Sequence, residues 1–360
     1  MIQPGRDVRR VLDWYFERAY GKLEGPGVLP FYCDPSRVGH FAVARDELAA
    51  GNATALFRLL IGQAMFQARR DVLIMRHQRA MTRTEVDSLV LPANLARKVS
   101  RSPCTTLESA NRFESECSVS KAGKMVDCAH HPGGPCHVKR ATTLFNRVGD
   151  MGKLPTSAWL HLAKDGDLND LLADVVAQSD EPRERARLLV ARFSRVHRIG
   201  RKLATMFVSA LSTPPLAPDL TPWFPTIDGS DLVVVDTNVA RAAVALGAAS
   251  VAYDAVTLWV QKQARRVDLR IYGRALTQYS PRVVQQALYV FCSKSNRVAH
   301  QDPCVAATAP CRECVVRLCP FAMSPKAARP SSPPVGRRPC QSQRSPMMTS
   351  KSLVQSTSKG

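Results

Sequence analysis

Four cysteines near the C-terminal end of the chain constrain its fold more than any other feature. They follow the spacing C-x6-C-x2-C-x4-C and are Cys304, Cys311, Cys314 and Cys319. A two-residue gap lets a tight turn aim two thiolates inward, while the longer gaps return the other two to the same centre. The run is too compact for free or disulfide-bonded cysteines, so it predicts a metal loop. A [4Fe-4S] cluster and a structural zinc ion both suit four thiolates, and spacing does not decide between them.

The charge of the chain points to a polyanionic partner. Its 360 residues include 50 Lys and Arg against 30 Asp and Glu, which gives a formal net charge of +20. Such an excess favours nucleic acid, ahead of an anionic membrane surface. Residues 322–360 form a basic Ser- and Pro-rich tail that has no acidic residue. We expect this tail to be disordered and to add non-specific DNA affinity, while the rest of the chain is still basic.

No targeting or membrane-spanning pattern is evident. The first residues lack a cationic head followed by an apolar stretch, and the most apolar span, 232–253, is broken by Asp236, Asn238 and Arg241. We therefore expect a cytoplasmic monomer, associated with the nucleoid in a bacterium or located in the nucleus of a eukaryote. In such a reducing compartment, the 11 cysteines indicate metal ligation and buried thiols rather than disulfides.

Apolar periodicity predicts a mainly α protein. Helical spacing is found at 7–20, 53–68, 138–148, 168–178, 184–211, 237–246, 253–265 and 282–291, and sustained β alternation is scarce. Residues 101–137 are rich in Ser, Cys, Gly and Pro and are interpreted as an inserted loop, and residues 213–230 as a Pro-rich connector. Cys128 and Cys136, with nearby histidines, are compatible with a second metal site, but a disordered insert explains them equally well.

The helical pattern at 184–211 is interrupted at Val196-His197-Arg198-Ile199-Gly200. Two helices joined by this turn would form a helix-hairpin-helix. Gly200 would permit close backbone approach, and the free N–H groups that begin the second helix would offer an anion site for a DNA phosphate. A helix pair with a glycine turn is also common as plain packing, so this pattern alone leaves both interpretations open.

A single carboxylate stands at the start of a later helix. Asp236 follows three valines in Val233-Val234-Val235-Asp236-Thr237-Asn238-Val239-Ala240-Arg241. Taken alone, it is equally well explained as an ordinary helix N-cap.

Taken together and in this order, the I-G-R-K-x-A turn, the V-D-T-N-V-A-R segment and the cysteine loop resemble the endonuclease III family of helix-hairpin-helix DNA glycosylases. The resemblance covers roughly residues 50–320. It implies that Lys202 is the amine that attacks the sugar, that Asp236 is the essential aspartate and that the four cysteines hold a [4Fe-4S] cluster, with structural zinc as the alternative. It also implies DNA contacts from Arg198, Ile199, Gly200 and Arg201, and it makes Gln63, in Leu60-Ile61-Gly62-Gln63, the wedge that fills the gap left by a flipped base.

The resemblance also implies an architecture of two helical lobes. Residues 50–212, with the insert at 101–137, would form the lobe that carries the hairpin. Residues 1–49 and 231–321 would join around the cluster, with the connector at 213–230 between the lobes and the tail at 322–360 outside them. Lys202 and Asp236 would then face each other across a cleft.

The chain departs from the family pattern at several positions. Arg198 stands where the family has its first hairpin glycine, so the turn must bend differently or tolerate strain. Lys202 and Asp236 are 34 positions apart, more than is usual, and the Pro-rich connector accounts for the excess. The last cysteine gap is one residue short, and residues 305–310 lack the Lys or Arg that family members commonly direct at DNA.

The expected function is base-excision repair of duplex DNA that contains a damaged base or an abasic site. Lys202, attacking as a neutral amine, would form a Schiff base with the sugar, and Asp236 would stabilise the cationic sugar as the base leaves. Elimination would then nick the strand. A monofunctional enzyme that uses Asp236 and water, and a non-catalytic DNA-binding protein, remain the alternatives. The adenine-excising branch is disfavoured because it usually has Ser at the position of Lys202, and the lesion itself is set only by analogy, with oxidised pyrimidines as the family default.

Overall fold

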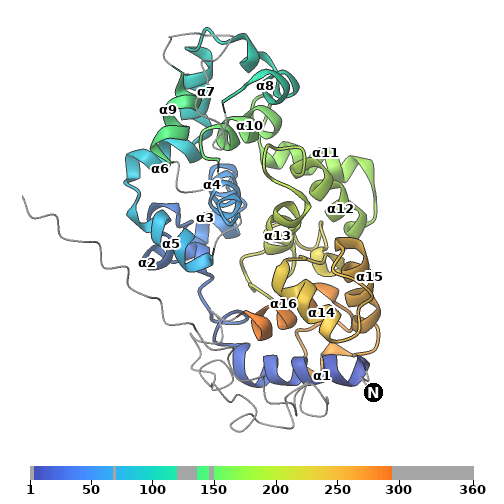
Figure 1. The fold of residues 1–360 in the computed structure, drawn as a ribbon. Coiled ribbons are helices and arrows are strands. Elements are labelled where there is room, and N and C mark those ends of the chain that lie inside the picture. The colour runs from blue at the N-terminus through green and yellow to red at the C-terminus, as the bar shows by residue number, and fades with distance from the viewer. Residues whose placement is uncertain (1–3, 68–69, 120–135, 146–149, 294–360) are drawn as a thin grey trace, which may run out of the picture.

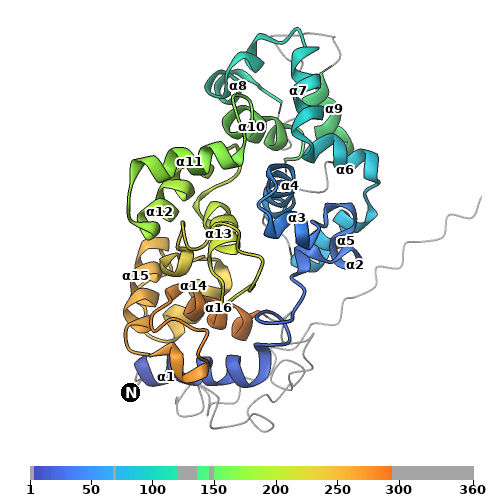
Figure 2. The same cartoon turned by 180° about the vertical axis from the view of Figure 1, so that it is seen from behind.

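The computed structural model describes residues 4–67, 70–119, 136–145 and 150–293, and within these ranges the chain is mainly α-helical and has no strand. This confirms the mainly α class expected from periodicity. The helices form an arch: α2–α5 make one arm, α6–α10 the crown, and α11–α13 the other arm, which continues into α14–α16 and α1 (Figures 1 and 2). Among the described helices, none is both long and apolar enough to cross a membrane.

The larger of two hydrophobic cores holds the arm, the crown and the facing arm together; we call this part the large lobe, residues 31–232. Its helices are α2 (Pro35–Val38), α3 (Arg45–Ala49), α4 (Ala53–Ala64), α5 (Asp71–Ala80), α6 (Arg83–Val90), α7 (Pro92–Ser100), α8 (Ala110–Glu116), α9 (His137–Leu144), α10 (Lys153–Leu162), α11 (Leu168–Gln178), α12 (Pro182–Phe193) and α13 (Arg201–Ser212). Short helical turns lie between them at Phe31–Cys33 (η2), Gly39–Phe41 (η3), Thr105–Glu108 (η4) and Gly229–Asp231 (η5). Helix α4 runs through the middle of this core because most of its apolar side chains are buried on all sides.

The smaller core brings the two ends of the described chain together; we call it the small lobe, residues 4–20 and 233–293. It consists of α1 (Pro4–Trp14), η1 (Tyr15–Ala19), α14 (Thr237–Ala245), α15 (Tyr253–Ala264), η6 (Leu269–Tyr272) and α16 (Pro281–Cys292). The ring of Trp14 meets that of Phe291 edge-on at 5.1 Å, and the Tyr272 hydroxyl donates to Asp13 at 2.6 Å. The N-terminal helix is therefore fixed to the last described helix.

The lobe boundary differs from the one expected at residue 49. Residues 32–48, including buried Phe41 and Leu48, pack into the core of the large lobe, and only the first helix and turn belong to the small lobe. Their apolar side chains fit beside α4 and α5, so the crossover between lobes comes near residue 30.

The connector at 213–230 is packed against the core of the large lobe. Trp223 is 2% exposed and lies at 5.6 Å from Phe207 and 6.2 Å from Phe193, measured between ring centroids. Proline-rich backbone cannot continue a helix, but it can carry large side chains into a core, and here it closes the large lobe beneath α12 and α13.

The insert at 101–137 is also partly folded, contrary to the loop expected there. Helix α8 buries Phe113, and the Glu114 carboxylate accepts hydrogen bonds from Ser157 at 2.5 Å and His161 at 3.1 Å. Lys153 donates to the carbonyl of Cys117 at 2.8 Å. The described part of the insert is thus anchored to α10, and Cys128 lies outside the described residues.

Candidate functional site

Helices α12 and α13 are joined by a seven-residue turn, 194–200, which is the segment expected to contact DNA. Phe193 at the end of α12 and Phe207 in α13 meet edge-on at 4.9 Å, and Ile199 in the turn is 1% exposed. Ile199 therefore anchors the turn in the core of the large lobe. Its side chain does not face outward as the expected DNA contact would, so only its backbone is open to that role.

Arg198 has a left-handed backbone, with φ of +65°. This is the position where the family pattern has glycine, and an arginine side chain there is strained. The turn therefore keeps the left-handed bend that a glycine would adopt freely, and it presents an exposed guanidinium at its tip.

His197 fixes the turn to the crown of the arch. Its backbone N–H donates to Ser157 at 2.9 Å, and its Nε2 lies 2.9 Å from Oδ2 of Asp150. Burial is the largest single influence on Asp150 and opposes its ionisation. The hydrogen bond and charge of His197, the backbone N–H of Lys153 and the charge of Arg198 together outweigh burial and hold the pKa of that carboxyl below its ordinary value. Two interactions thus hold the strained turn in place.

Gly200 begins α13 with φ of −77° and ψ of 175°, which any residue adopts. A Cβ at this position would meet no described atom within 4 Å. The fold therefore does not require glycine here. No side chain caps α13, so the backbone N–H groups of Arg201 and Lys202 have no hydrogen-bond acceptor among the described residues.

Arg201 is engaged within the chain. Its guanidinium forms an ion pair with Asp254 and lies 4.4 Å from the centroid of the Tyr253 ring. The Tyr253 hydroxyl in turn donates to the carbonyl of Val233 at 2.8 Å. Arg201 therefore links α13 in the large lobe to α15 in the small lobe. A DNA phosphate that contacts Arg201 would compete with Asp254 for its guanidinium.

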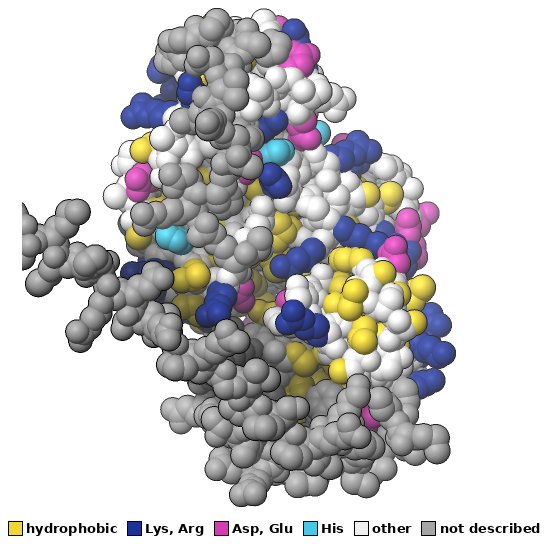
Figure 3. All heavy atoms as spheres, in the orientation of Figure 1, with side chains coloured by type: hydrophobic (Ala, Val, Ile, Leu, Met, Phe, Trp, Pro, Cys, Tyr) yellow, Lys and Arg dark blue, Asp and Glu magenta, His cyan; other side chains and the backbone are white. Residues whose placement is uncertain are grey.

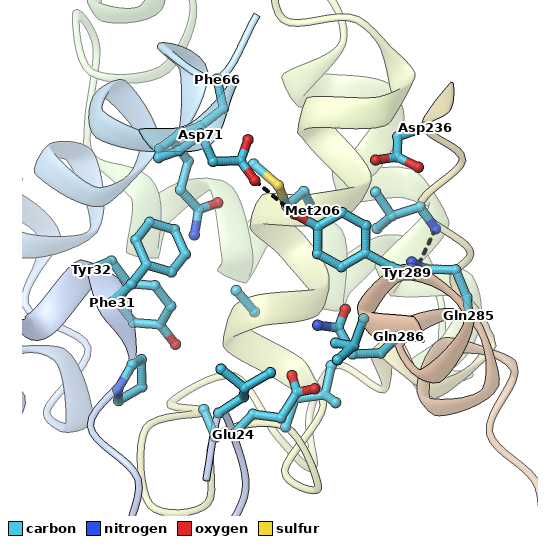
Figure 4. A pocket seen from close by; sticks show the side chains of 18 of the residues that line it. Glu24, Phe31, Tyr32, Phe66, Asp71, Met206, Asp236, Gln285, Gln286 and Tyr289 are labelled. Atoms are coloured by element: carbon cyan, nitrogen blue, oxygen red, sulfur yellow. Dashed lines mark hydrogen bonds between the residues drawn. The ribbon is translucent and has the colours of Figure 1, made fainter. Parts of the chain in front are cut away.

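A cavity of about 320 Å³ lies between the lobes. Side chains of the arm formed by α2–α5 line one side of the cavity. Side chains of α13, of α16 and of the residues that begin α14 line the other side (Figure 4). In the space-filling view, dark-blue Lys and Arg side chains stand at the edges of the hollow between these two sides, with yellow apolar side chains inside it (Figure 3).

Lys202 and Asp236 both line this cavity. They come from different elements, the first turn of α13 and the N-terminus of α14, and from opposite ends of the connector. Lys202 is half-buried, and its ammonium forms no hydrogen bond or ion pair with any described residue. An amine and a carboxylate are thus presented to the same enclosed space.

Asp236 also caps α14. Its Oδ1 accepts the backbone N–H of Val239 at 2.7 Å, while its second oxygen has no hydrogen-bond donor among the described residues. The two interpretations of this residue are therefore compatible, because one oxygen orients the carboxylate and the other is left for the cavity (Figure 4).

Gln63 lies inside the cavity rather than on its outer rim. Its side chain is 3% exposed, and its Oε1 has no hydrogen-bond partner among the described residues. A wedge must project into the base stack, so this position differs from the one expected. A buried amide oxygen without a partner is costly, and it is found where a ligand or water completes the pairing.

Several polar residues of the cavity belong to no sequence motif. Glu24 accepts a hydrogen bond from the Tyr15 hydroxyl at 2.5 Å, and burial raises its pKa from the ordinary 4.5 to about 7, although Tyr15, Arg282 and Gln286 act in the opposite direction. Arg282 is itself buried. A lone glutamate in a loop carries no local pattern, so only its distant partners reveal it.

Asp71 and Tyr289 form a bridge across the cavity. The Tyr289 hydroxyl on α16 donates to Oδ2 of Asp71 at the start of α5, at 2.7 Å (Figure 4). Burial, together with the charges of Asp71 and Asp236, raises the pKa of the tyrosine well above its ordinary value. This hydrogen bond joins α5 to α16 across the cavity that Lys202 and Asp236 also line.

The four-cysteine loop, Cys304, Cys311, Cys314 and Cys319, lies outside the described residues, as does the basic tail. Within the described ranges, no group of three or more His, Cys, Asp and Glu side chains is arranged to hold a metal ion. Comparison of the chain with protein-family models, with curated proteins and with solved structures finds no match.

Proposed function

We propose that the chain is a helix-hairpin-helix DNA glycosylase with abasic-site lyase activity. The observation that carries the proposal is that Lys202 and Asp236, chosen from two separate sequence motifs, line one cavity between two lobes. An excised base must leave the helix stack and enter a pocket, and a cavity of about 320 Å³ has the size of a small-molecule site.

The chemistry follows from these two side chains. The neutral amine of Lys202 attacks C1′ of the extruded nucleotide, the bond from C1′ to the base breaks, and its electron pair leaves with the base. The free oxygen of Asp236 stabilises the positive charge that develops on the sugar and accepts a proton from the attacking amine. Opening of the sugar ring then gives an imine, and loss of a 2′ proton expels the 3′ phosphate and nicks the strand.

The turn at 194–200 supplies the DNA contact in this proposal. The unfilled N–H groups that begin α13 and the exposed guanidinium of Arg198 suit a backbone phosphate beside the cavity. The open space around Gly200 would admit that phosphate.

A different residue from Gln63 is suited to prop the gap in the DNA stack. Val72 lines the cavity at the beginning of α5, and its side chain is 55% exposed. An apolar side chain at such a rim can fill the space of a missing base without leaving a polar group unpaired. We therefore propose that Val72 fills the gap left by the flipped base, and that Gln63 contacts the base inside the cavity.

The cluster loop completes the proposal. The four cysteines are assigned to a [4Fe-4S] cluster whose role is to stabilise the end of the small lobe against DNA. Purified protein should contain iron and acid-labile sulfide and show the visible absorption of such a cluster. Zinc in place of iron would refute the assignment to iron without affecting Lys202.

Borohydride trapping on a duplex with one abasic site tests the function. The wild-type protein should form a covalent adduct that is absent in Lys202→Ala and present in Lys262→Ala, which removes an exposed lysine of α15 outside the cavity. Release of a damaged base from a lesion duplex, without an adduct on the abasic duplex, would favour the monofunctional alternative, with Asp236 and water. Tight binding to both duplexes with neither adduct nor base release would leave a non-catalytic DNA-binding protein.

A further inference from the structure

One end of the cavity is built as a fixed hydrogen-bond acceptor. Glu24 lies at the opposite end from Asp236 and next to Gln286 (Figure 4). The Tyr15 hydroxyl donates to its Oε1 at 2.5 Å, and the Gln286 side chain donates to the same carboxyl group. Both neighbours are donors, so they hold the Glu24 carboxyl group in place as an acceptor at this end of the cavity.

Arg282 sets the orientation of this group. Its guanidinium donates to Oε1 of Gln285 at 2.9 Å and to Oε1 of Gln286 at 2.7 Å, and its Nε donates to Ser209 at 2.9 Å. Because the amide oxygen of Gln286 is taken by Arg282, its amide nitrogen is the atom left to face Glu24. The buried cation also compensates part of the cost of a buried carboxylate.

The opposite wall of the cavity is aromatic. Phe31 meets both Tyr32 and Phe66 edge-on, at 5.4 Å between centroids in each case. Figure 4 shows Phe31 and Tyr32 across the cavity from Gln286 and Tyr289. A planar ring fits between such walls, because aromatic side chains pack favourably on the faces and edges of other rings.

Gln63 provides a second, independent observation that a ligand belongs here. Its amide is buried, lines the same cavity and leaves Oε1 unpaired among the described residues. The cavity thus combines an aromatic wall with an anchored carboxylate and a free amide, which is the chemistry that recognises the edge of a heterocyclic base.

We propose that Glu24 and Gln63 are the residues that read the extruded base, and that the protein selects bases whose inward-facing edge carries an N–H donor. This inference rests on the proposed function, since it deepens the role of the same cavity. In it, the base lies against Phe31 and Tyr32, its N–H donates to the Glu24 carboxylate, and Gln63 pairs with a neighbouring polar atom of the ring. Glu24 touches the base and not the sugar, so it is a specificity residue.

An abasic site has no base to read. Adduct formation on abasic DNA therefore tests the proposed lyase activity, whereas release of a damaged base also tests base reading by Glu24. Glu24→Gln keeps the size of the side chain but offers an amide where the carboxylate stood. We expect it to lower base release and affinity about 10–100-fold on the best substrate of a panel of 5,6-dihydrouracil, 5-hydroxycytosine, uracil and 8-oxoguanine duplexes. Borohydride adduct formation and binding to a duplex with a tetrahydrofuran abasic analogue should change less than about twofold. Glu47→Gln, an exposed acid on α3, is the matched control.

The pH profile gives a further readout. The titratable and charged groups facing Glu24 are Tyr15, Tyr20, Tyr32 and Arg282, and only Glu24 has a pKa near 7. Preference for lesion over abasic DNA should therefore rise with pH as the carboxylate ionises, and it should be flat in Glu24→Gln. A preference that instead falls as pH rises would make Glu24 a proton donor and overturn its role as acceptor.

Three further results would decide whether Glu24 reads the base. Equal loss of base release and of abasic-site adduct in Glu24→Gln, with an unchanged melting temperature, would place Glu24 in the chemistry rather than in base reading. No loss of either, or undiminished binding of a base methylated at its edge nitrogen, would refute the inference while the function stands. Failure of the wild-type protein to form any abasic-site adduct would refute the lyase proposal, whereas a Glu24-dependent preference for lesion over tetrahydrofuran duplex would still support base reading.

Discussion

Replacing Arg198 with glycine tests whether the turn before α13 is strained. At φ of +65° an L-residue pays roughly 1–2 kcal/mol for the left-handed conformation. Glycine avoids that cost but loses roughly 0.5–1 kcal/mol through its greater freedom in the unfolded chain. The free energy of unfolding should therefore change by between about 0 and +1.5 kcal/mol in Arg198→Gly.

Arg198→Ala is the matched variant, because alanine also lacks the guanidinium but keeps a Cβ. Urea unfolding of both variants should show Arg198→Gly to be the more stable by about 1 kcal/mol, with the same dependence of free energy on urea concentration. An Arg198→Gly variant that is less stable than Arg198→Ala would refute the strain, since His197 and Ile199 anchor the turn identically in both.

The same pair of variants tests the phosphate contact. Both lose one positive charge at the tip of the turn, so both should bind duplex DNA more weakly, and the slope of log affinity against log salt should fall by about 0.9. Arg198→Gly should gain stability and lose affinity together. If its DNA affinity and salt slope equal those of the wild-type protein, Arg198 makes no phosphate contact.

Three further predictions follow from the site. Asp236→Asn should keep the cap on α14, because asparagine caps as well as aspartate, so the free energy of unfolding should stay within about 0.5 kcal/mol of the wild-type value while base release is abolished. Asp236→Ala should abolish base release and also lower the free energy of unfolding by about 1 kcal/mol in denaturant titration. A Cβ at Gly200 meets no described atom, so Gly200→Ala should fold normally yet bind DNA more weakly by fluorescence anisotropy, and unchanged binding would remove the turn from the interface. The folded pKa of Glu24 is about 7, above its ordinary 4.5, so the folded state retains a proton that the unfolded chain releases. Its contribution to stability should therefore decline as pH rises from about 4.5 to 7, and the difference between wild type and Glu24→Gln in urea midpoints against pH should show that decline.

Local patterns predicted the helices well where capping and periodicity agreed. The helix expected at 253–265 is α15 (Tyr253–Ala264), and that at 282–291 is α16 (Pro281–Cys292). The loop expected at 101–137 is partly wrong. Helix α8 is short, and long-range hydrogen bonds from Lys153 and Ser157 of α10 to the Cys117 carbonyl and to Glu114 hold it in place, which no local periodicity records. Local pattern also gives no sign that Trp223, in the Pro-rich connector, is buried, because the helices that bury it lie elsewhere in the chain.

The residues of the candidate site also differ in whether local sequence could predict them. Lys202 and Asp236 could be chosen from the sequence because each stands at the start of a helix within a recognisable run of neighbours. Glu24, Asp71 and Tyr289 could not, because their chemistry depends on partners from other elements.

The sequence by itself determined that the chain is basic, that it is mainly helical and that Lys202 and Asp236, the proposed catalytic residues, stand at the starts of α13 and α14. Those properties depend on composition and on interactions within a few residues. Only the tertiary structure decided that these two side chains share a cavity, that Gln63 faces its interior and that a carboxylate from residue 24 closes its far end. Burial and long-range hydrogen bonding set these properties, and both arise only when segments as distant as α1 and α16 pack together.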